Sequence, residues 1–143
     1  MGRILGIDLG RRRIGLAVSD PSRTLARPLQ ALLVKGHDAI DQVAGHIDAL
    51  AADADGLEAI VVGMPMRLDG SPTDETSRVV KFIEQLRART SIPVFEEDER
   101  LTSREAESRL ALRERSWRKR KARIDAAAAA IILQDYLDRT SEP

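Results

Sequence analysis

The sequence predicts an α/β domain with a mixed five-stranded sheet flanked by helices. Three short apolar runs come first, and the connections between them are too short to hold a helix. After them, helical patterns alternate with two further apolar runs. Short connections suit antiparallel strands and helical crossovers suit parallel ones, so we expect three antiparallel strands followed by parallel strands. The 143 residues fit a single domain, 1–143.

The opening strands are predicted at Ile4–Leu9 and Ile14–Val18, on either side of a turn that begins at Gly10. Both runs have the length of an ordinary strand. Gly10 offers the permissive backbone that a hairpin turn needs. A third stretch, Thr24–Val34, is interrupted by Pro28, so we expect a bent or edge strand there.

Beyond these strands, apolar residues either follow helical spacing or form short runs. We expect Ser71, which precedes Pro72, to be the N-cap of the second helix. The predicted elements are a helix over 38–53, strand Glu58–Gly63, a helix with the inner face Val79, Phe82, Ile83 and Leu86, strand Ile92–Phe95, a helix after a capping box at Thr102–Glu105, and a last helix from about Arg123 to Leu137.

Composition excludes several classes of protein. Hydrophobic residues make up 43%, which is far from a disordered composition. The absence of cysteine excludes a disulfide framework and a thiolate metal site. No apolar run approaches the length of a membrane span, and no signal peptide is visible, so a cytoplasmic protein is expected.

Positive charge is concentrated in one segment of a chain whose net charge is zero. Residues 113–123 hold seven of the 23 basic residues, with Trp117 among them. Such a segment suits a loop that contacts nucleic-acid phosphates, and Trp117 could stack on a base. A solvated loop with Trp117 packed against the core is the alternative. The candidate nucleic-acid contacts are Arg113, Arg115, Trp117, Arg118, Lys119, Arg120 and Lys121.

Asp8 is an unexpected residue in the first strand, because the strand is otherwise apolar on both faces. Burying a carboxylate costs several kcal/mol unless a hydrogen bond, a cation or a metal compensates. Gly6 and Gly10 share its face and leave room for something to approach closely. The alternative is that Asp8 lies at a strand end and hydrogen-bonds the turn.

Further acids are predicted to lie near Asp8. Asp98 and Glu99 are expected just past the carboxyl end of the last strand, where ligand sites of open α/β sheets gather. Asp125 begins the last helix, where a helix cap or a favourable helix-dipole interaction is the alternative account. On a helical wheel Asp125 aligns with an apolar line that should face the sheet, namely Ala129, Ile132 and Tyr136.

Together these acids indicate a metal site. Clustered carboxylates repel one another unless a cation neutralises them. Oxygen ligands without cysteine or an aligned histidine favour Mg²⁺ or Mn²⁺. Two such ions about 4 Å apart would activate a water and stabilise the leaving oxygen in phosphodiester cleavage.

Four segments, in order and over nearly the entire chain, resemble motifs of the YqgF (RuvX) family. They are Gly6–Asp20, Val62–Pro65 with Asp69–Ser71, Asp98–Ala106, and Ile124–Tyr136. This family has an RNase H-like fold and is grouped with Holliday-junction resolvases. The resemblance implies a nuclease that processes the 5′ end of pre-16S ribosomal RNA.

The resemblance also implies which residues act. It places catalysis on Asp8, on Asp98 or Glu99, and on Asp125, with Asp8, Glu99 and Asp125 as metal ligands. Resolvases of the RuvC type carry an acid at the end of the fourth strand, whereas this chain has Gly63–Pro65 there. The second acid must then come from the Asp98–Glu99 pair, and we favour Glu99.

Other functions stay open at this point. The protein could be a resolvase of four-way DNA junctions, or a nucleic-acid-binding module of the same fold without catalysis. ATPases of the actin and heat-shock class also begin with an Asp-x-Gly hairpin, but they need two related lobes, and 143 residues supply one. The choice between precursor ribosomal RNA and branched DNA, and the oligomeric state, a homodimer included, are not decided by the sequence.

Overall fold

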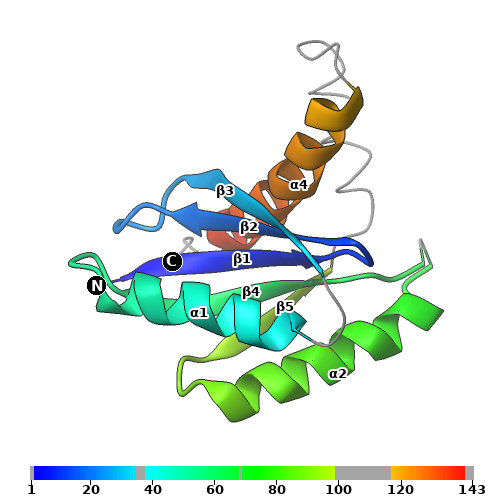
Figure 1. Ribbon diagram of the computed structural model, residues 1–143, viewed down its shortest axis with the longest axis horizontal. Helices are drawn as coiled ribbons and strands as arrows, with labels where there is room; N and C mark the ends of the chain where they lie inside the picture. The colour runs from blue at the N-terminus through cyan, green and yellow to red at the C-terminus, as the bar shows by residue number, and fades with distance from the viewer. Residues whose placement is uncertain (1, 35–37, 68, 99–116, 141–143) are drawn as a thin grey trace.

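The computed structural model describes residues 2–34, 38–67, 69–98 and 117–140, with the backbone alone over 117–125. Its sheet has the strand order β3-β2-β1-β4-β5 (Figure 1). The central strand β1 (Arg3–Leu9) pairs antiparallel with β2 (Arg13–Ser19) and parallel with β4 (Leu57–Met64). The edge strands are β3 (Ala26–Leu33), antiparallel to β2, and β5 (Val94–Asp98), parallel to β4. The predicted mixed five-stranded sheet is confirmed.

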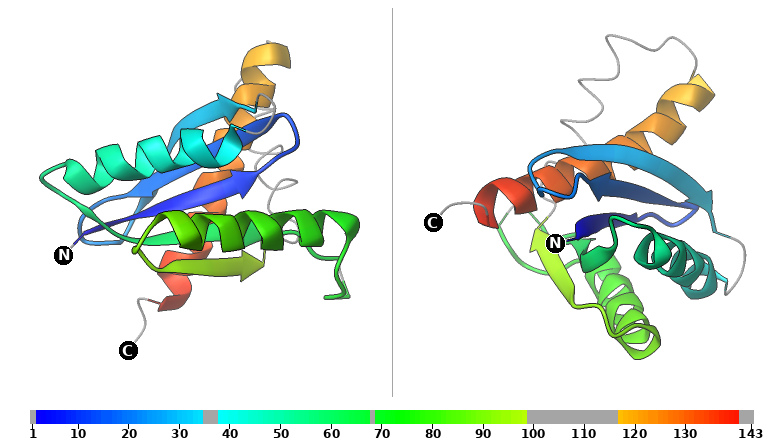
Figure 2. Two further views of the ribbon diagram at one scale, coloured as in Figure 1. Left: turned by 60° about the horizontal axis from the view of Figure 1, so that its bottom comes forward. Right: turned by 90° about the vertical axis from the view of Figure 1, so that its left-hand side faces the viewer.

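Helices cover both faces of the sheet. Helices α1 (Ala39–Ala52) and α2 (Asp74–Arg89) lie on one face, and α4 (Trp117–Thr140) crosses the other (Figure 2). Apolar side chains of α1 and α2 pack against one face of the sheet and form a large hydrophobic core. Side chains of α4 pack against the opposite face and form a smaller one. Within the described ranges, no helix is both long and apolar enough to cross a bilayer.

Strand β1 is buried on both sides, which explains why its residues are apolar throughout. Leu5 and Ile7 point toward α1 and α2, while Ile4 points toward α4. Fully burying a Leu or Ile side chain contributes about 1.5–3 kcal/mol, so this strand is firmly fixed in the fold. The penultimate residue of the strand, Asp8, is therefore carried on a rigid element.

Helix α4 lies directly against the backbone of β1 at Gly6. A Cβ atom at Gly6 would lie 2.8 Å from the Cβ of Leu133 and 3.1 Å from the carbonyl oxygen of Ala129. Only glycine allows a backbone approach of this kind. The sequence suggested that Gly6 leaves room beside Asp8, and α4 occupies that room.

Gly10 is required for a different reason from the one the sequence suggested. Among the described glycines only Gly56 and Gly70 have positive φ, so Gly10 does not use a left-handed backbone. A Cβ at Gly10 would instead lie 2.5 Å from the carbonyl oxygen of Arg13, across the turn. The β1–β2 turn is therefore too tight for a side chain at this position.

The start of α2 was misplaced by the sequence pattern. The helix begins at Asp74, and Thr73, not Ser71, is its N-cap. The Thr73 N–H donates to Thr76 Oγ1 at 2.8 Å. The Ser71 N–H and hydroxyl donate to Asp69 Oδ1 at 2.9 and 2.6 Å, so Ser71 belongs to the preceding turn.

Two other boundaries differ from expectation. Strand β5 ends at Asp98 instead of Phe95, because its parallel ladder with β4 continues through Glu96 and Glu97. Helix α4 begins at Trp117, about six residues before the predicted start. The helix predicted after Thr102 lies outside the described residues.

The close approach at Gly6 gives a prediction for stability. Replacing Gly6 with Ala should lower the free energy of unfolding by about 1–3 kcal/mol, because the added methyl group overpacks against Leu133 and Ala129. Gly45→Ala is the matched control, since nothing lies within 4 Å of the added Cβ in the middle of α1. That change should raise stability by about 0.5–1 kcal/mol. Urea denaturation measures the free energy of unfolding of both variants and of wild type. A Gly6→Ala protein as stable as wild type would contradict the prediction.

Candidate active site

Asp8 lies near the carboxyl end of the central strand and is half-buried. Alternation along β1 places it on the same face as Ile4 and Gly6, which contact α4. The expectation that Asp8 lies in a strand is confirmed, although its side chain keeps partial access to solvent. A half-buried carboxylate at a strand end can bind a ligand and yet stay fixed in position.

Glycines lie beside Asp8 on both neighbouring strands. Asp8 is paired with Gly15 of β2. On the other side the parallel ladder pairs Ile7 with Val62, so the next position places Gly63 of β4 beside Asp8. Sequence reasoning did not assign a role to Gly15 and treated Gly63 only as a missing acid.

Four glycines therefore surround Asp8 on its own face of the sheet. Gly6 and Gly10 lie two residues away along the chain, and Gly15 and Gly63 lie on the adjacent strands. Helix α4 covers the position at Gly6. At the other three positions the sheet itself offers no side chain that would keep an ion or a phosphate away from the carboxylate.

Helix α4 crosses the sheet obliquely, and where it passes β1 its chain runs from the end of the strand toward the start (Figures 1 and 2). Leu137, late in the helix, lines one cavity together with Ile4, early in the strand. Ala129, two turns earlier in the helix, lies against Gly6, which is further along the strand. The residues of α4 just before Ala129 thus lie toward the carboxyl end of β1.

The backbone of α4 places Asp125 on the side of the helix that faces the sheet. It precedes Ala129 by about one turn, and Ala129 and Ile132 are fully buried against the sheet. Tyr136, the last member of the same line, is partly buried there, so the predicted apolar line is confirmed. Asp8 lies beyond Gly6 in the same direction. The side chain of Asp125 lies outside the described part of the structure.

The acids at the end of β5 separate onto two faces of the sheet. Glu97 is paired with Gly63 and forms an ion pair with Arg139 of α4, so it shares the face of Asp8. Asp98 is paired with Met64, whose side chain lies in the core beneath α1 and α2. The structure therefore does not bring Asp98 to the face of Asp8, and Glu99 lies outside the described residues.

Glu97 is an acid that sequence reasoning did not single out. Its side chain is only 11% exposed. Burial raises its pKa, while the charge and hydrogen bond of Arg139 oppose this shift and the nearby Asp135 and Asp98 reinforce it. Strand alternation could have identified Glu97, had the last strand been placed correctly.

The aromatic residues of this face stabilise the position of α4. Phe95 of β5 stacks on Tyr136 with ring centroids 6.0 Å apart. The guanidinium of Arg139 lies 5.6 Å from the centre of the Tyr136 ring. The Arg139 guanidinium therefore contacts both the face of the Tyr136 ring and the Glu97 carboxylate. These contacts fix the end of α4 on β5.

No three potential metal ligands come together among the described residues. Of the three predicted ligands only the side chain of Asp8 belongs to the described part. Its surroundings nevertheless fit a hard cation, since the donor is a carboxylate and glycines flank it on both adjacent strands.

The basic segment is partly helical, which corrects the expected loop. Trp117, Arg118, Lys119, Arg120 and Lys121 occupy the first turns of α4. Figure 1 shows this part of the helix extending beyond the sheet. Their side chains, and all of Arg113 and Arg115, lie outside the described residues, so contact with nucleic acid stays a prediction.

Comparison with known proteins decides the family. A family model described as "RuvX: Holliday junction resolvase" matches residues 2–139. The chain belongs to the RuvX family. The expected family is thereby confirmed.

Curated relatives of this RuvX-family chain are named "Putative pre-16S rRNA nuclease". The protein from Anaeromyxobacter dehalogenans is 44% identical, with 96% of this chain and 97% of the relative aligned. The protein from Roseiflexus sp. is 40% identical over 96% of this chain and 94% of its own length. Among solved structures, Thermus thermophilus RuvC aligns with a TM-score of 0.49 at 17% identity, covering 97% of this chain and 96% of RuvC.

The raised pKa of Glu97 predicts how the free energy of unfolding depends on pH. The folded protein holds this proton more tightly than the unfolded chain does, so the contribution of Glu97 to stability falls as the pH rises through its folded pKa. Glu97→Gln should therefore show a smaller loss of stability than wild type over that pH range. Glu96→Gln, on the exposed opposite face of β5, is the control and should follow the wild-type profile. Denaturant titrations from pH 4 upward test this, and coincident profiles for Glu97→Gln and wild type would contradict it.

Proposed function

We propose that this protein is a metal-dependent nuclease that hydrolyses a phosphodiester bond near the 5′ end of pre-16S ribosomal RNA. The observation that carries the proposal is the half-buried Asp8 with glycines on both adjacent strands. The chain that carries this site is 40% identical to a relative named "Putative pre-16S rRNA nuclease". A carboxylate placed in this way can approach a phosphate group through a bound cation.

Asp8, Glu99 and Asp125 are the proposed metal ligands. Asp8 lies near the carboxyl end of β1, and Asp125 precedes the buried Ala129 of α4 by about one turn, which supports a place for Asp125 near the same end of the sheet. Bound Mg²⁺ or Mn²⁺ would supply an activated water and stabilisation of the leaving oxygen. The protein's own part is to hold the carboxylates rigidly and to leave the sheet free of side chains beside Asp8.

Strand alternation counts against Asp98 as the second ligand, which leaves Glu99 as the proposed member of the pair. Glu97 shares the face of Asp8, whereas Asp98 belongs to the opposite face. Asp98 therefore faces away from Asp8, and Glu99, the other acid of the pair, lies outside the described residues. Asp98 would then carry no direct role in catalysis.

Resolution of four-way DNA junctions is the second candidate activity, because the matching family model carries that description. Both substrates present phosphodiesters to the same carboxylates, so the site at Asp8 suits either. A non-catalytic binding module is the third alternative. Cytoplasmic location and a homodimer remain predictions.

The first experiment compares three acid variants in one cleavage assay. Asp8→Asn and Glu99→Gln should lower the cleavage rate by orders of magnitude while binding of nucleic acid persists, because each loses a charge that the metal needs. Asp98→Asn is the matched control and should retain most of the activity. The substrates are a precursor ribosomal RNA and a four-way DNA junction, each with Mg²⁺, Mn²⁺ or excess chelator.

Each outcome of this assay is informative. Cleavage of the RNA alone supports the proposed substrate, whereas cleavage of the junction alone supports the second candidate. Undiminished cleavage in chelator would refute metal dependence. Tight binding without cleavage in any metal would indicate a binding module, and wild-type activity in Asp8→Asn would remove Asp8 from the site.

The second experiment tests the basic segment. A variant with Arg118, Lys119, Arg120 and Lys121 replaced by Ala should bind nucleic acid more weakly, and its affinity should depend less on salt. If all four contact phosphates, the log–log slope becomes shallower by roughly three to four on duplex nucleic acid. Asp8→Asn is the control and should keep the wild-type slope. An unchanged slope in the fourfold variant would show that these residues are not the phosphate contact.

A further inference from the structure

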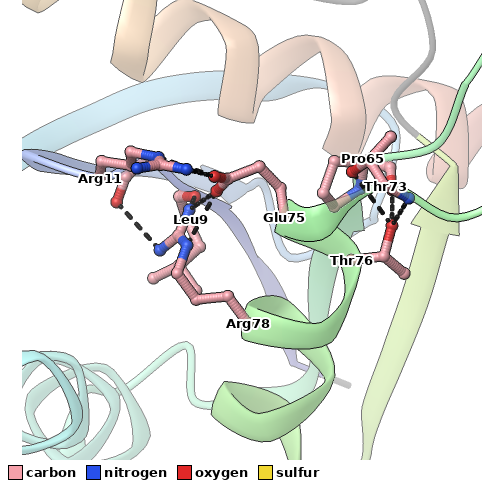
Figure 3. A network of polar contacts seen from close by, with 8 residues as sticks. Leu9, Arg11, Pro65, Thr73, Glu75, Thr76 and Arg78 are labelled. Carbon is pink, nitrogen blue, oxygen red and sulfur yellow. Dashed lines mark hydrogen bonds and ion pairs between the residues drawn. The ribbon is translucent and has the colours of Figure 1, made fainter.

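Helix α2 is attached to the residues that follow Asp8 in the chain (Figure 3). Arg78 Nη2 donates to the carbonyl oxygen of Leu9 at 2.9 Å, and Nη1 donates to that of Gly10 at 3.5 Å. The carbonyl oxygen of Asp8 itself accepts the Gly10 N–H at 3.2 Å. The carbonyl groups of three consecutive residues, beginning with Asp8, are thus held by hydrogen bonds.

Arg78 is held in place by Glu75, one turn earlier in α2. Its Nε donates to Glu75 Oε2 at 2.8 Å. The other oxygen of Glu75 accepts from Arg11 Nε at 2.7 Å, so one carboxylate joins α2 to the β1–β2 turn. Hydrogen bonds from Arg78, and then from Arg11, lower the pKa of Glu75, which keeps it charged at neutral pH. The ion pair with Glu75 therefore orients the Arg78 guanidinium toward the carbonyl groups at the end of β1.

The same turn of α2 also holds the end of β4. The Thr76 hydroxyl donates to the carbonyl oxygen of Pro65 at 2.5 Å, and this proline follows Gly63 and Met64. Figure 3 shows both groups of contacts at the start of one helix. The first turns of α2 thus hold the ends of the two strands that carry Asp8 and Gly63.

We propose that Arg78 is a positioning residue for Asp8, and this inference rests on the proposed nuclease function. Side chains alternate along β1, so fixing the carbonyl groups of Leu9 and Gly10 also fixes the direction in which the Asp8 carboxylate leaves the strand. A strand end whose carbonyls lose their partners opens locally at low cost. Catalytic groups must be held to within about 0.5 Å, so such opening would disturb metal binding at Asp8.

The contacts of Arg78 differ from those of an ordinary surface ion pair such as the one formed by Arg89. Arg89, at the other end of α2, pairs with Asp41 of α1 and holds the two helices together. Arg78 bonds to the strand itself, directly after the proposed ligand. Replacing either arginine removes one ion pair, but only the change at Arg78 frees the carbonyls beside Asp8.

The test compares Arg78→Ala, Arg78→Lys and the control Arg89→Ala, all in the full chain and below their melting temperatures. The readouts are kcat, KM and the Mn²⁺ concentration that gives half of the metal-induced rise in melting temperature. Arg78→Ala should lower kcat about 10–100-fold and raise that Mn²⁺ concentration, with KM nearly unchanged. Arg78→Lys should recover part of the loss, since one ammonium can reach a carbonyl but cannot also keep the fork geometry with Glu75. Arg89→Ala should match wild type in kcat and in Mn²⁺ response.

The outcomes distinguish failure of this inference from failure of the proposed function. If wild type cleaves and Arg78→Ala has wild-type kcat and Mn²⁺ response, the positioning role is wrong and the nuclease proposal stands. If wild type does not cleave but binds Mn²⁺ through Asp8, the function fails. A higher Mn²⁺ requirement in Arg78→Ala would then still support positioning, and an unchanged one would overturn it. A wild type that neither cleaves nor binds Mn²⁺ overturns both.

Discussion

The contact between α4 and β1 at Gly6 is the constraint on which the geometry of one whole face depends. The missing side chain at Gly6 lets the backbone of Ala129 and the Cβ of Leu133 lie directly against the strand. Because this contact fixes the height of the helix over the sheet, it also fixes where the earlier residues of α4 can lie. Asp125 belongs to the same helical line as Ala129, so the proposed place of Asp125 near the end of β1 depends on this packing.

At the carboxyl ends of β1 and β4, one face of the sheet carries the proposed site and the other face is held by contacts from α2. On the α4 face, glycines beside Asp8 keep the sheet free of side chains. On the opposite face, Arg78 and Thr76 of α2 bind the backbone at the end of β1 and just after β4. The pleat of a strand links these tasks, because a backbone held from one side determines the direction of the side chains on the other.

Much of this arrangement could be predicted from the sequence, because its signals are local. The apolar runs of β1 and β2 and the helical line from Ala129 to Tyr136 gave correct elements and correct faces. The end of β5 could not be predicted in this way. Glu96, Glu97 and Asp98 carry no apolar signal, and they extend the strand only because β4 supplies a ladder of backbone partners. The role of Arg78 was hidden for the same reason, since it depends on residues 69 positions apart in the chain.

The absence of an acid at the end of β4 has a consequence for how binding and chemistry would be coupled. With Gly63 beside Asp8, the remaining proposed ligands, Glu99 and Asp125, stand at the two ends of one segment, 99–125. The proposed phosphate contacts all lie within that segment, from Arg113 to Lys121. Metal bound at its ends and nucleic acid bound along its length would contact the same stretch of chain. By thermodynamic linkage, the factor by which nucleic acid changes the affinity for metal must equal the factor by which metal changes the affinity for nucleic acid.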